Sequence, residues 1–79
     1  MKPDEIVFFK ICFKMREKNV SVREVINLFS GLIHHKRCWY LLEKWSRLGF
    51  YDYGVNLELG WFYVNEMPDR YRNLLWGET

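Results

Sequence analysis

The spacing of hydrophobic and polar positions changes near Gly49. Before that residue, apolar side chains recur at the three- and four-residue intervals of amphipathic helices. After it come short runs rich in aromatic and branched residues, which are typical of β-strands. We therefore expect three helices, then a β-hairpin, and a short helix at the end.

The first helix is predicted over residues 3–18. A proline in the first turn and two following acids, Asp4 and Glu5, suit the positive N-terminal end of a helix dipole. Its apolar positions cover more than half of the circumference: Phe8, Phe9, Ile11, Cys12, Phe13 and Met15. Such a helix is apolar on several sides, so it is either a central helix or part of a dimer interface.

The second helix has the clearest start. Ser21 and Glu24 form a capping box, and Val20 and Val25 have the spacing of a hydrophobic staple. Its apolar face is expected to contain Val22, Val25, Ile26 and Phe29, with Leu32 and Ile33 just beyond. Gly31 is the expected stop.

The third helix is predicted over residues 34–48, with two well-separated faces. The expected core positions are Cys38, Leu41, Leu42, Trp45 and Leu48. The opposite face carries Lys36, Arg37, Tyr40, Glu43, Lys44 and Arg47, with Trp39 at the edge between the two.

The hairpin is expected to pair residues 50–53 with residues 57–64 around turn-forming residues at 54–56. A last helix is expected over residues 68–76, and residues 77–79 should fray.

This order of elements resembles the winged helix-turn-helix superfamily over residues 4–64. The residues that carry the resemblance are the entry to the second helix, Val20 to Glu24, and the exit from the third, Trp45 to Phe50. The resemblance implies an α+β fold, a three-helix winged helix-turn-helix with a hairpin wing and a short terminal helix. It also implies a regulatory protein that lays its third helix in the major groove of duplex DNA.

The basic outer face of the third helix agrees with that implication, because Lys and Arg neutralise phosphates. The candidate DNA-binding residues are His35, Lys36, Arg37, Tyr40, Lys44 and Arg47. A charged outer face is also what any solvated amphipathic helix shows, so both interpretations stay open.

The hairpin departs from the family pattern. Residues 51–66 contain three acids and no base, whereas DNA-contacting wings commonly carry Arg or Lys near the tip. Its tip is apolar, which indicates packing or a partner. The alternative function is therefore a protein-interaction module, of the kind expected in bacteriophage or mobile-element genomes. Its candidate interface contains Val55, Leu57, Leu59, Trp61 and Tyr63.

Composition sharpens this picture. The 79 residues suffice for one domain, 1–79, yet 19% are aromatic, more than a small core needs. Residues 1–48 carry ten basic and five acidic groups, and residues 49–79 carry two basic and five acidic groups, so net charges of +5 and −3 give +2 overall. The broad apolar arc and the aromatic C-terminal part predict a homodimer, which would bring two basic helices to adjacent half-sites.

Other chemistry is not expected. The sequence has no apolar run long enough to cross a membrane and begins with acids rather than a signal peptide, so we expect a cytoplasmic protein. Cys12 and Cys38 are expected to be buried thiols rather than a disulfide. His34, His35 and Cys38 have ligand-like spacing but lack a fourth partner, so no metal or cofactor is predicted. A buried Cys38 would also be a poor nucleophile, so we expect no enzyme.

Overall fold

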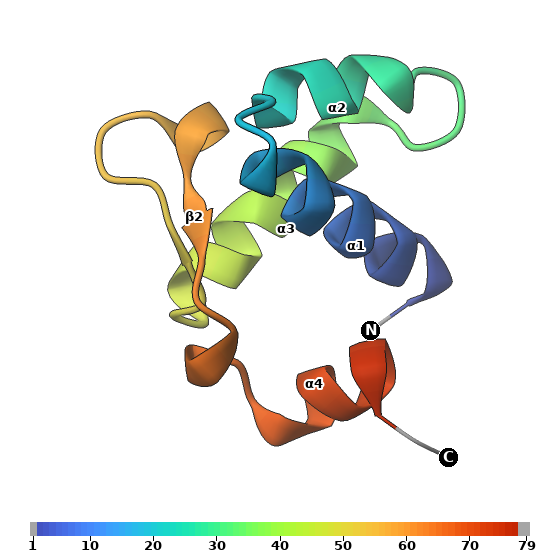
Figure 1. The fold of residues 1–79 in the computed structure, drawn as a ribbon. Coiled ribbons are helices and arrows are strands. Elements are labelled where there is room, and N and C mark those ends of the chain that lie inside the picture. The colour runs from blue at the N-terminus through green and yellow to red at the C-terminus, as the bar shows by residue number, and fades with distance from the viewer. Residues whose placement is uncertain (1, 78–79) are drawn as a thin grey trace.

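The computed structural model describes residues 2–77, which form four α-helices and a two-stranded antiparallel sheet (Figure 1). The α-helices are α1 (Pro3–Glu17), α2 (Val22–Leu28), α3 (His35–Arg47) and α4 (Asp69–Trp76). The strands are β1 (Tyr51–Asp52) and β2 (Trp61–Phe62), and two short 3₁₀ helices are η1 (Leu57–Leu59) and η2 (Val64–Glu66). The expected α+β class and element order are confirmed, and the order is compatible with a helix-turn-helix followed by a hairpin. Of the expected frayed residues, Glu78 and Thr79 lie outside the described part.

Helix α1 is the central element. Phe8, Phe9 and Cys12 are fully buried, because α1 packs against α2 and α4 and is joined to α3 by side-chain contacts. In Figure 1, α1 lies in front of α3, between α2 and α4. Its broad apolar arc is thus explained first by its position in the core. The helix ends one residue before the expected boundary, and Lys18 becomes its C-cap.

The α2–turn–α3 segment forms through two side-chain caps. Ser21 Oγ accepts a hydrogen bond from the Glu24 amide at 3.3 Å, which confirms the Ser21 half of the predicted capping box. At the start of α3, His34 Nδ1 accepts from the Lys36 amide at 3.2 Å. Because α2 already ends at Leu28, Gly31 lies within the turn at a φ of 89°, and Leu32 is 79% exposed instead of extending the apolar face.

The prediction that Leu48 belongs to the core is wrong. Helix α3 ends at Arg47, and Leu48 is its exposed C-cap. Gly49 follows with a φ of 96° and donates its amide to the Trp45 carbonyl at 3.1 Å. This left-handed turn redirects the chain before the side chain of Leu48 reaches the core.

The hairpin is much shorter than predicted, because only two residue pairs, Tyr51 with Phe62 and Asp52 with Trp61, form the sheet. The hydroxyl of Tyr51 explains part of the difference: it donates to the Leu57 carbonyl and accepts from the Gly60 amide at 3.0 Å. These two backbone groups are thereby removed from strand pairing, and Leu57 begins a 3₁₀ turn instead. Burial of the Tyr51 ring raises the pKa of its phenol to about 12.

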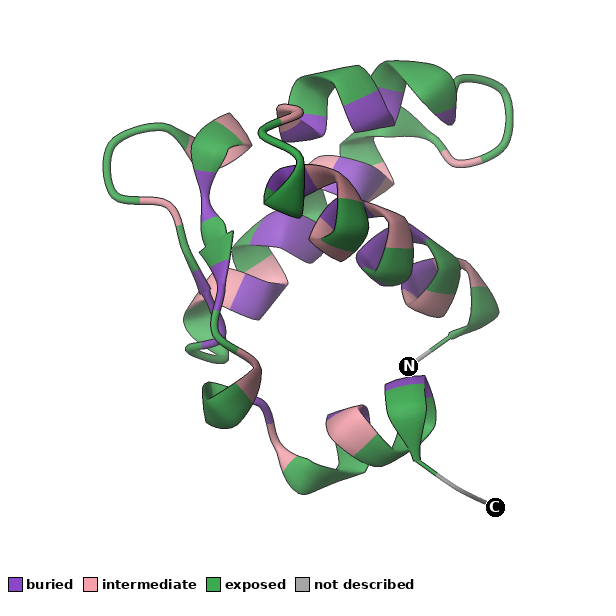
Figure 2. Cartoon of the chain, in the orientation of Figure 1, coloured by how far each residue is buried: buried purple, intermediate pink, exposed green. Residues whose placement is uncertain are grey.

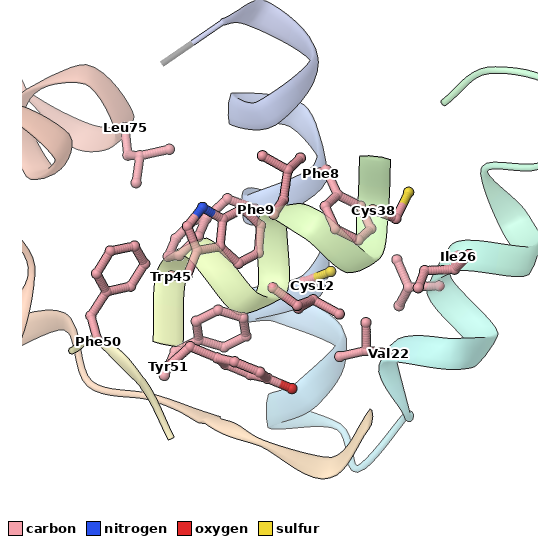
Figure 3. Packing of buried hydrophobic residues seen from close by; sticks show 14 of the residues in the cluster. Phe8, Phe9, Cys12, Val22, Ile26, Cys38, Trp45, Phe50, Tyr51 and Leu75 are labelled. Atoms are coloured by element: carbon pink, nitrogen blue, oxygen red, sulfur yellow. The ribbon is translucent and has the colours of Figure 1, made fainter. Parts of the chain in front are cut away.

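Figure 2 shows where the buried residues lie along the chain. Aromatic rings fill the core between α1, α3, the hairpin and α4 (Figure 3). The Phe9 ring meets Trp45 edge-on, with 5.2 Å between centroids, and meets Phe62 in the same way at 5.0 Å. Four aromatic residues expected in the core are buried: Phe8, Phe9, Phe29 and Trp45. Phe13, on the expected apolar arc of α1, is only half-buried, and Trp39, expected at the edge between the two faces of α3, packs partly against the core.

We predict that Gly60→Ala destabilises the fold. A Cβ atom at Gly60 would lie 2.2 Å from Cζ of the buried Tyr51 ring, so the ring or the hairpin has to shift. Overpacking of this kind costs about 1–3 kcal/mol, measured as the free energy of unfolding in urea. The control Val55→Ala, at an exposed position of the same hairpin, should leave stability unchanged. Equal stability of wild type and Gly60→Ala would contradict the packing described for Tyr51.

Candidate nucleic-acid interface

The exposed face of α3 carries a narrow stripe of polar side chains. Lys36, Tyr40 and Arg47 are all exposed, and at 100° per residue they project within about 40° of one another. The Arg47 guanidinium lies 6.0 Å from the centroid of the Tyr40 ring. Glu43 is exposed on the same stripe. Within residues 2–77, neither Lys36 nor Arg47 forms an ion pair, so both cations are available to a ligand.

Arg37 belongs to a different part of the helix surface. Its guanidinium forms two hydrogen bonds to the carboxylate of Asp4 in the first turn of α1, one of them 3.0 Å long. The hydrogen bond from Arg37 lowers the pKa of Asp4, and the same bond raises the pKa of Arg37. Arg37 therefore joins α3 to α1, and much of its charge is already matched.

Lys44 is held in the same way by Glu5, which is only 1% exposed. Its Nζ atom donates to both Glu5 carboxylate oxygens, at 3.1 and 3.2 Å, and Trp45 Nε1 donates to Glu5 at 2.9 Å. Burial favours the neutral form of Lys44, but its hydrogen bonds to Glu5 and the charge of Glu5 outweigh this, so its pKa is raised. Lys44 is consequently an internal partner of α1.

The six candidate DNA-binding residues thus divide into two groups. His35, Lys36, Tyr40 and Arg47 are exposed, whereas Arg37 and Lys44 are half-buried in ion pairs. Helical periodicity could not separate them, because their partners lie 33 and 39 residues earlier in the chain. The sequence signal for these ion pairs is the two neighbouring acids Asp4 and Glu5, which local pattern relates only to the helix dipole.

A cleft of about 470 Å³ lies beside the start of α3, and sequence analysis did not predict it. Residues of α2, the turn and α3 line it: Arg23, Ile26, Asn27, Ser30, Gly31, Ile33, His34, His35 and Trp39. None of these lining residues is acidic. The rings of His34 and His35 stack with 4.4 Å between centroids. The cleft therefore combines apolar side chains with side chains able to donate hydrogen bonds, and none of its polar groups is a carboxylate.

Arg23 closes one side of this cleft. Its guanidinium lies 5.4 Å from the Trp39 ring and forms an ion pair with Glu58 of η1. This pair ties the hairpin to α2 and neutralises one of the three hairpin acids.

The candidate protein interface on the hairpin is mostly exposed. Val55 is fully exposed, and Leu59, Trp61 and Tyr63 are about half exposed. Leu57 is the exception, because it is half-buried and packs against the core within η1. The hairpin surface is thus formed by four of the five predicted residues.

Two further observations concern metal and thiol chemistry. Among residues 2–77, no group of three or more His, Cys, Asp or Glu side chains is arranged to hold a metal ion. Cys12 and Cys38 are both free and buried, as expected, and burial raises the pKa of each thiol. Both are therefore protonated near neutral pH. In the described part of the chain, no helix has the length and apolar character needed to cross a membrane.

Comparison with known proteins gives no relative: no family model, curated protein or solved structure matches this chain. The functional argument therefore depends on the exposed stripe of α3, the adjacent cleft and the hairpin. Of these, the cleft borders the start of α3, where His35 and Trp39 line it.

We predict strong energetic coupling between Glu5 and Lys44. Lys44→Met leaves a buried carboxylate without its ammonium partner, so the free energy of unfolding should fall by about 2 kcal/mol or more. The double variant Glu5→Leu with Lys44→Met removes both charges and should lose less than the sum of the two single losses. Urea unfolding of all four proteins at neutral pH measures this cycle. Additive losses would show that the two side chains act independently.

Proposed function

We propose that this protein binds duplex DNA through the exposed stripe of α3, on a winged helix-turn-helix scaffold, in a regulatory role. The observation that carries the proposal is the stripe itself. The stripe projects from a helix that follows a short turn and consists of Lys36, Tyr40 and Arg47. Neither Lys36 nor Arg47 forms an ion pair within residues 2–77.

The dimensions of α3 suit this role. A major groove about 12 Å wide admits an α-helix. The 13 residues of α3 give this helix a length of about 20 Å along the groove. Helix-turn-helix proteins contact base edges mainly with the N-terminal residues of the second helix of the motif. Here these residues are His35, Lys36 and Tyr40, which are exposed and able to donate hydrogen bonds.

The cleft beside α3 supplies contacts of a second kind. Asn27 and Ser30 of the α2–turn segment carry neutral donors of the type that commonly bind DNA phosphates. Because its lining contains no carboxylate, the cleft does not repel a phosphate. We infer that α2 and the turn bind the phosphate backbone of the DNA, while α3 faces the bases.

The hairpin contributes little to this mode of binding. It contains Asp52, Glu58 and Glu66 and no basic residue, so its charge opposes contact with phosphate. Only Glu58 among them is neutralised by an ion pair in the described residues. DNA contact is therefore assigned to the α2–α3 segment, unlike the wing contacts of many proteins with this architecture.

The test is the double variant Lys36→Glu with Arg47→Glu. Both side chains are exposed, so we expect the fold to persist and binding to a labelled duplex at low salt to weaken at least tenfold. If each cation contacts one phosphate, the slope of log affinity against log salt should fall by roughly 0.9 per contact. Fluorescence anisotropy over a salt series measures both quantities. Arg37 and Lys44 are unsuitable targets, because changing them disturbs the junction with α1.

A matched control is Lys18→Glu with Arg70→Glu. This variant makes the same change in net charge at exposed positions outside α3. We expect it to retain most of the binding. Equal weakening by the two double variants, or no weakening by Lys36→Glu with Arg47→Glu, would remove α3 from the proposal.

The second candidate is a protein-interaction module that uses the hairpin. The observation that favours it is the exposed apolar surface at Val55, Leu59 and Trp61 in a segment that carries no cation. Non-specific electrostatic binding should be visible at low salt for any DNA-binding protein. If wild type binds no duplex there, this second candidate is favoured.

A further inference from the structure

A groove lined by aromatic rings follows α1 between the hairpin and α4. We call it the aromatic groove and define it by Phe13, with Trp61 of β2 at one end and Trp76 of α4 at the other. Two hollows of about 100 and 400 Å³ adjoin at Phe13 and Glu17, which line both. The smaller hollow also contacts Trp61, and the larger contacts Trp76. The groove therefore offers two separate places for apolar side chains, with the Phe13 ring between them.

The two tryptophans of the groove are held in place although Trp61 is 45% and Trp76 is 47% exposed. The Trp76 ring meets Phe13 edge-on, with 5.6 Å between centroids. The Arg16 guanidinium lies 5.7 Å from the Trp61 ring, and its Nε donates to the Gly60 carbonyl at 2.9 Å. Apolar surface of this kind, with a charged rim, is typical of a site that another molecule covers.

Cations border the aromatic groove on both sides. At 100° per residue, Lys10 and Arg16 project about 60° to either side of Phe13. Lys14 follows Lys10 by one turn on the same side, and none of the three cations forms an ion pair within residues 2–77. Among the described residues, Glu17 is the only acid that lines either hollow, so three positive charges and one negative charge leave a net charge of +2. The groove consequently attracts a partner whose net charge is negative.

Glu17 and Arg16 distinguish between the anionic partners. A nucleic acid carries a phosphate on every nucleotide, so a strand that follows the groove has to place one near the Glu17 carboxylate. The Arg16 guanidinium also lies over the Trp61 ring, which leaves less of that ring for stacking on a base. A protein segment can place a neutral side chain over Glu17 and its acids opposite the three cations. A second copy of this chain is disfavoured, because it would oppose two grooves with the same excess of positive charge.

The cations on both edges also indicate the secondary structure of the partner segment. Side chains of a β-strand alternate between two opposite faces, so a strand with its apolar face on Phe13 points its other side chains into solvent. An amphipathic helix instead carries flanking residues on both sides of an apolar stripe. Acids in those flanking positions lie next to Lys10 and Lys14 on one edge and next to Arg16 on the other.

We propose that the aromatic groove binds an acidic amphipathic helix of another protein. Apolar side chains at helical spacing occupy the two hollows, and acids on either flank pair with the cations at the rim, as in other helix-in-groove complexes. The stripe residues of α3, Lys36, Tyr40 and Arg47, line neither hollow. The proposal therefore holds whether or not the protein binds DNA.

The test selects helical peptides displayed on phage against the full chain. Apolar residues occupy positions i, i+4 and i+7 of every peptide, and each flanking position encodes Glu or Lys with equal frequency. The selected sequences thus report which charge the groove prefers. We expect Glu to exceed Lys by at least about twofold at each flanking position, the ratio expected for one partly exposed ion pair.

Fluorescence anisotropy of the strongest labelled peptide then locates the surface to which it binds. Lys10→Glu with Lys14→Glu should weaken binding by about tenfold or more, because it reverses both charges on one edge. The matched control Lys36→Glu with Arg47→Glu makes the same change in net charge on α3 and should leave the affinity unchanged. Glu17→Gln removes the acid of the lining and should strengthen binding by roughly twofold. Circular dichroism of each variant verifies that the helices persist.

Four results would overturn the proposal. The first is equal or greater enrichment of Lys at the flanking positions. The second is a selection that gives no binder, or only binders that Lys10→Glu with Lys14→Glu does not weaken. The third is binding of an oligonucleotide or of anionic lipid vesicles that this double variant abolishes and the α3 control does not. The fourth is a dimeric mass for wild type, measured by light scattering, that Trp76→Ala converts into a monomeric one. The last two results would assign the groove to those other partners.

Discussion

The buried carboxylate of Glu5 determines how the two main helices lie against each other. A charge this deeply buried is strongly destabilising unless it is paired and hydrogen-bonded, and here the Lys44 ammonium and the Trp45 indole donate three hydrogen bonds. Both donors lie on α3, so the interaction fixes the rotation of α3 about its own axis. The pair of Arg37 with Asp4 acts about two turns earlier on α3. Which side chains of α3 face outward therefore depends on two acids at the start of α1.

Arg16 performs the corresponding task near the other end of α1. Its side chain is buried, and it donates to the carbonyls of Gly60 and Val20, at 2.9 and 3.1 Å. These bonds attach the hairpin and the entry to α2 to the same helix. A two-residue sheet would be marginal by itself. Arg16 and the packing of Phe62 against Phe9 attach the hairpin to α1. Within the hairpin, the Tyr51 hydroxyl bonds to its backbone.

Local pattern was sufficient to predict the helices but not their connections. The cap at Ser21 and the buried positions of α3 follow from periodicity and turn chemistry, and these interactions span only a few residues. The ion pairs of Asp4 and Glu5 join residues more than 30 positions apart, and the local pattern placed Lys44 on the outward face. The same limit explains the short strands, because the bonds of the Tyr51 hydroxyl to the Leu57 and Gly60 backbone leave no local trace in the sequence.

The high aromatic content follows from the two faces of α1. A chain of 79 residues has a large surface relative to its volume, so large rings are an effective way to bury apolar area. Phe8 and Phe9 do this on the inner face. Trp61 and Trp76 lie on the outer face, where about half of each side chain remains in water. Trp76 packs there edge-on against Phe9 and Phe13. Their contacts with Arg16 and Phe13 hold them there, next to Lys10, Lys14 and Glu17. A single helix thus organises the core with one face and, with the other, holds half-exposed aromatic rings at the surface.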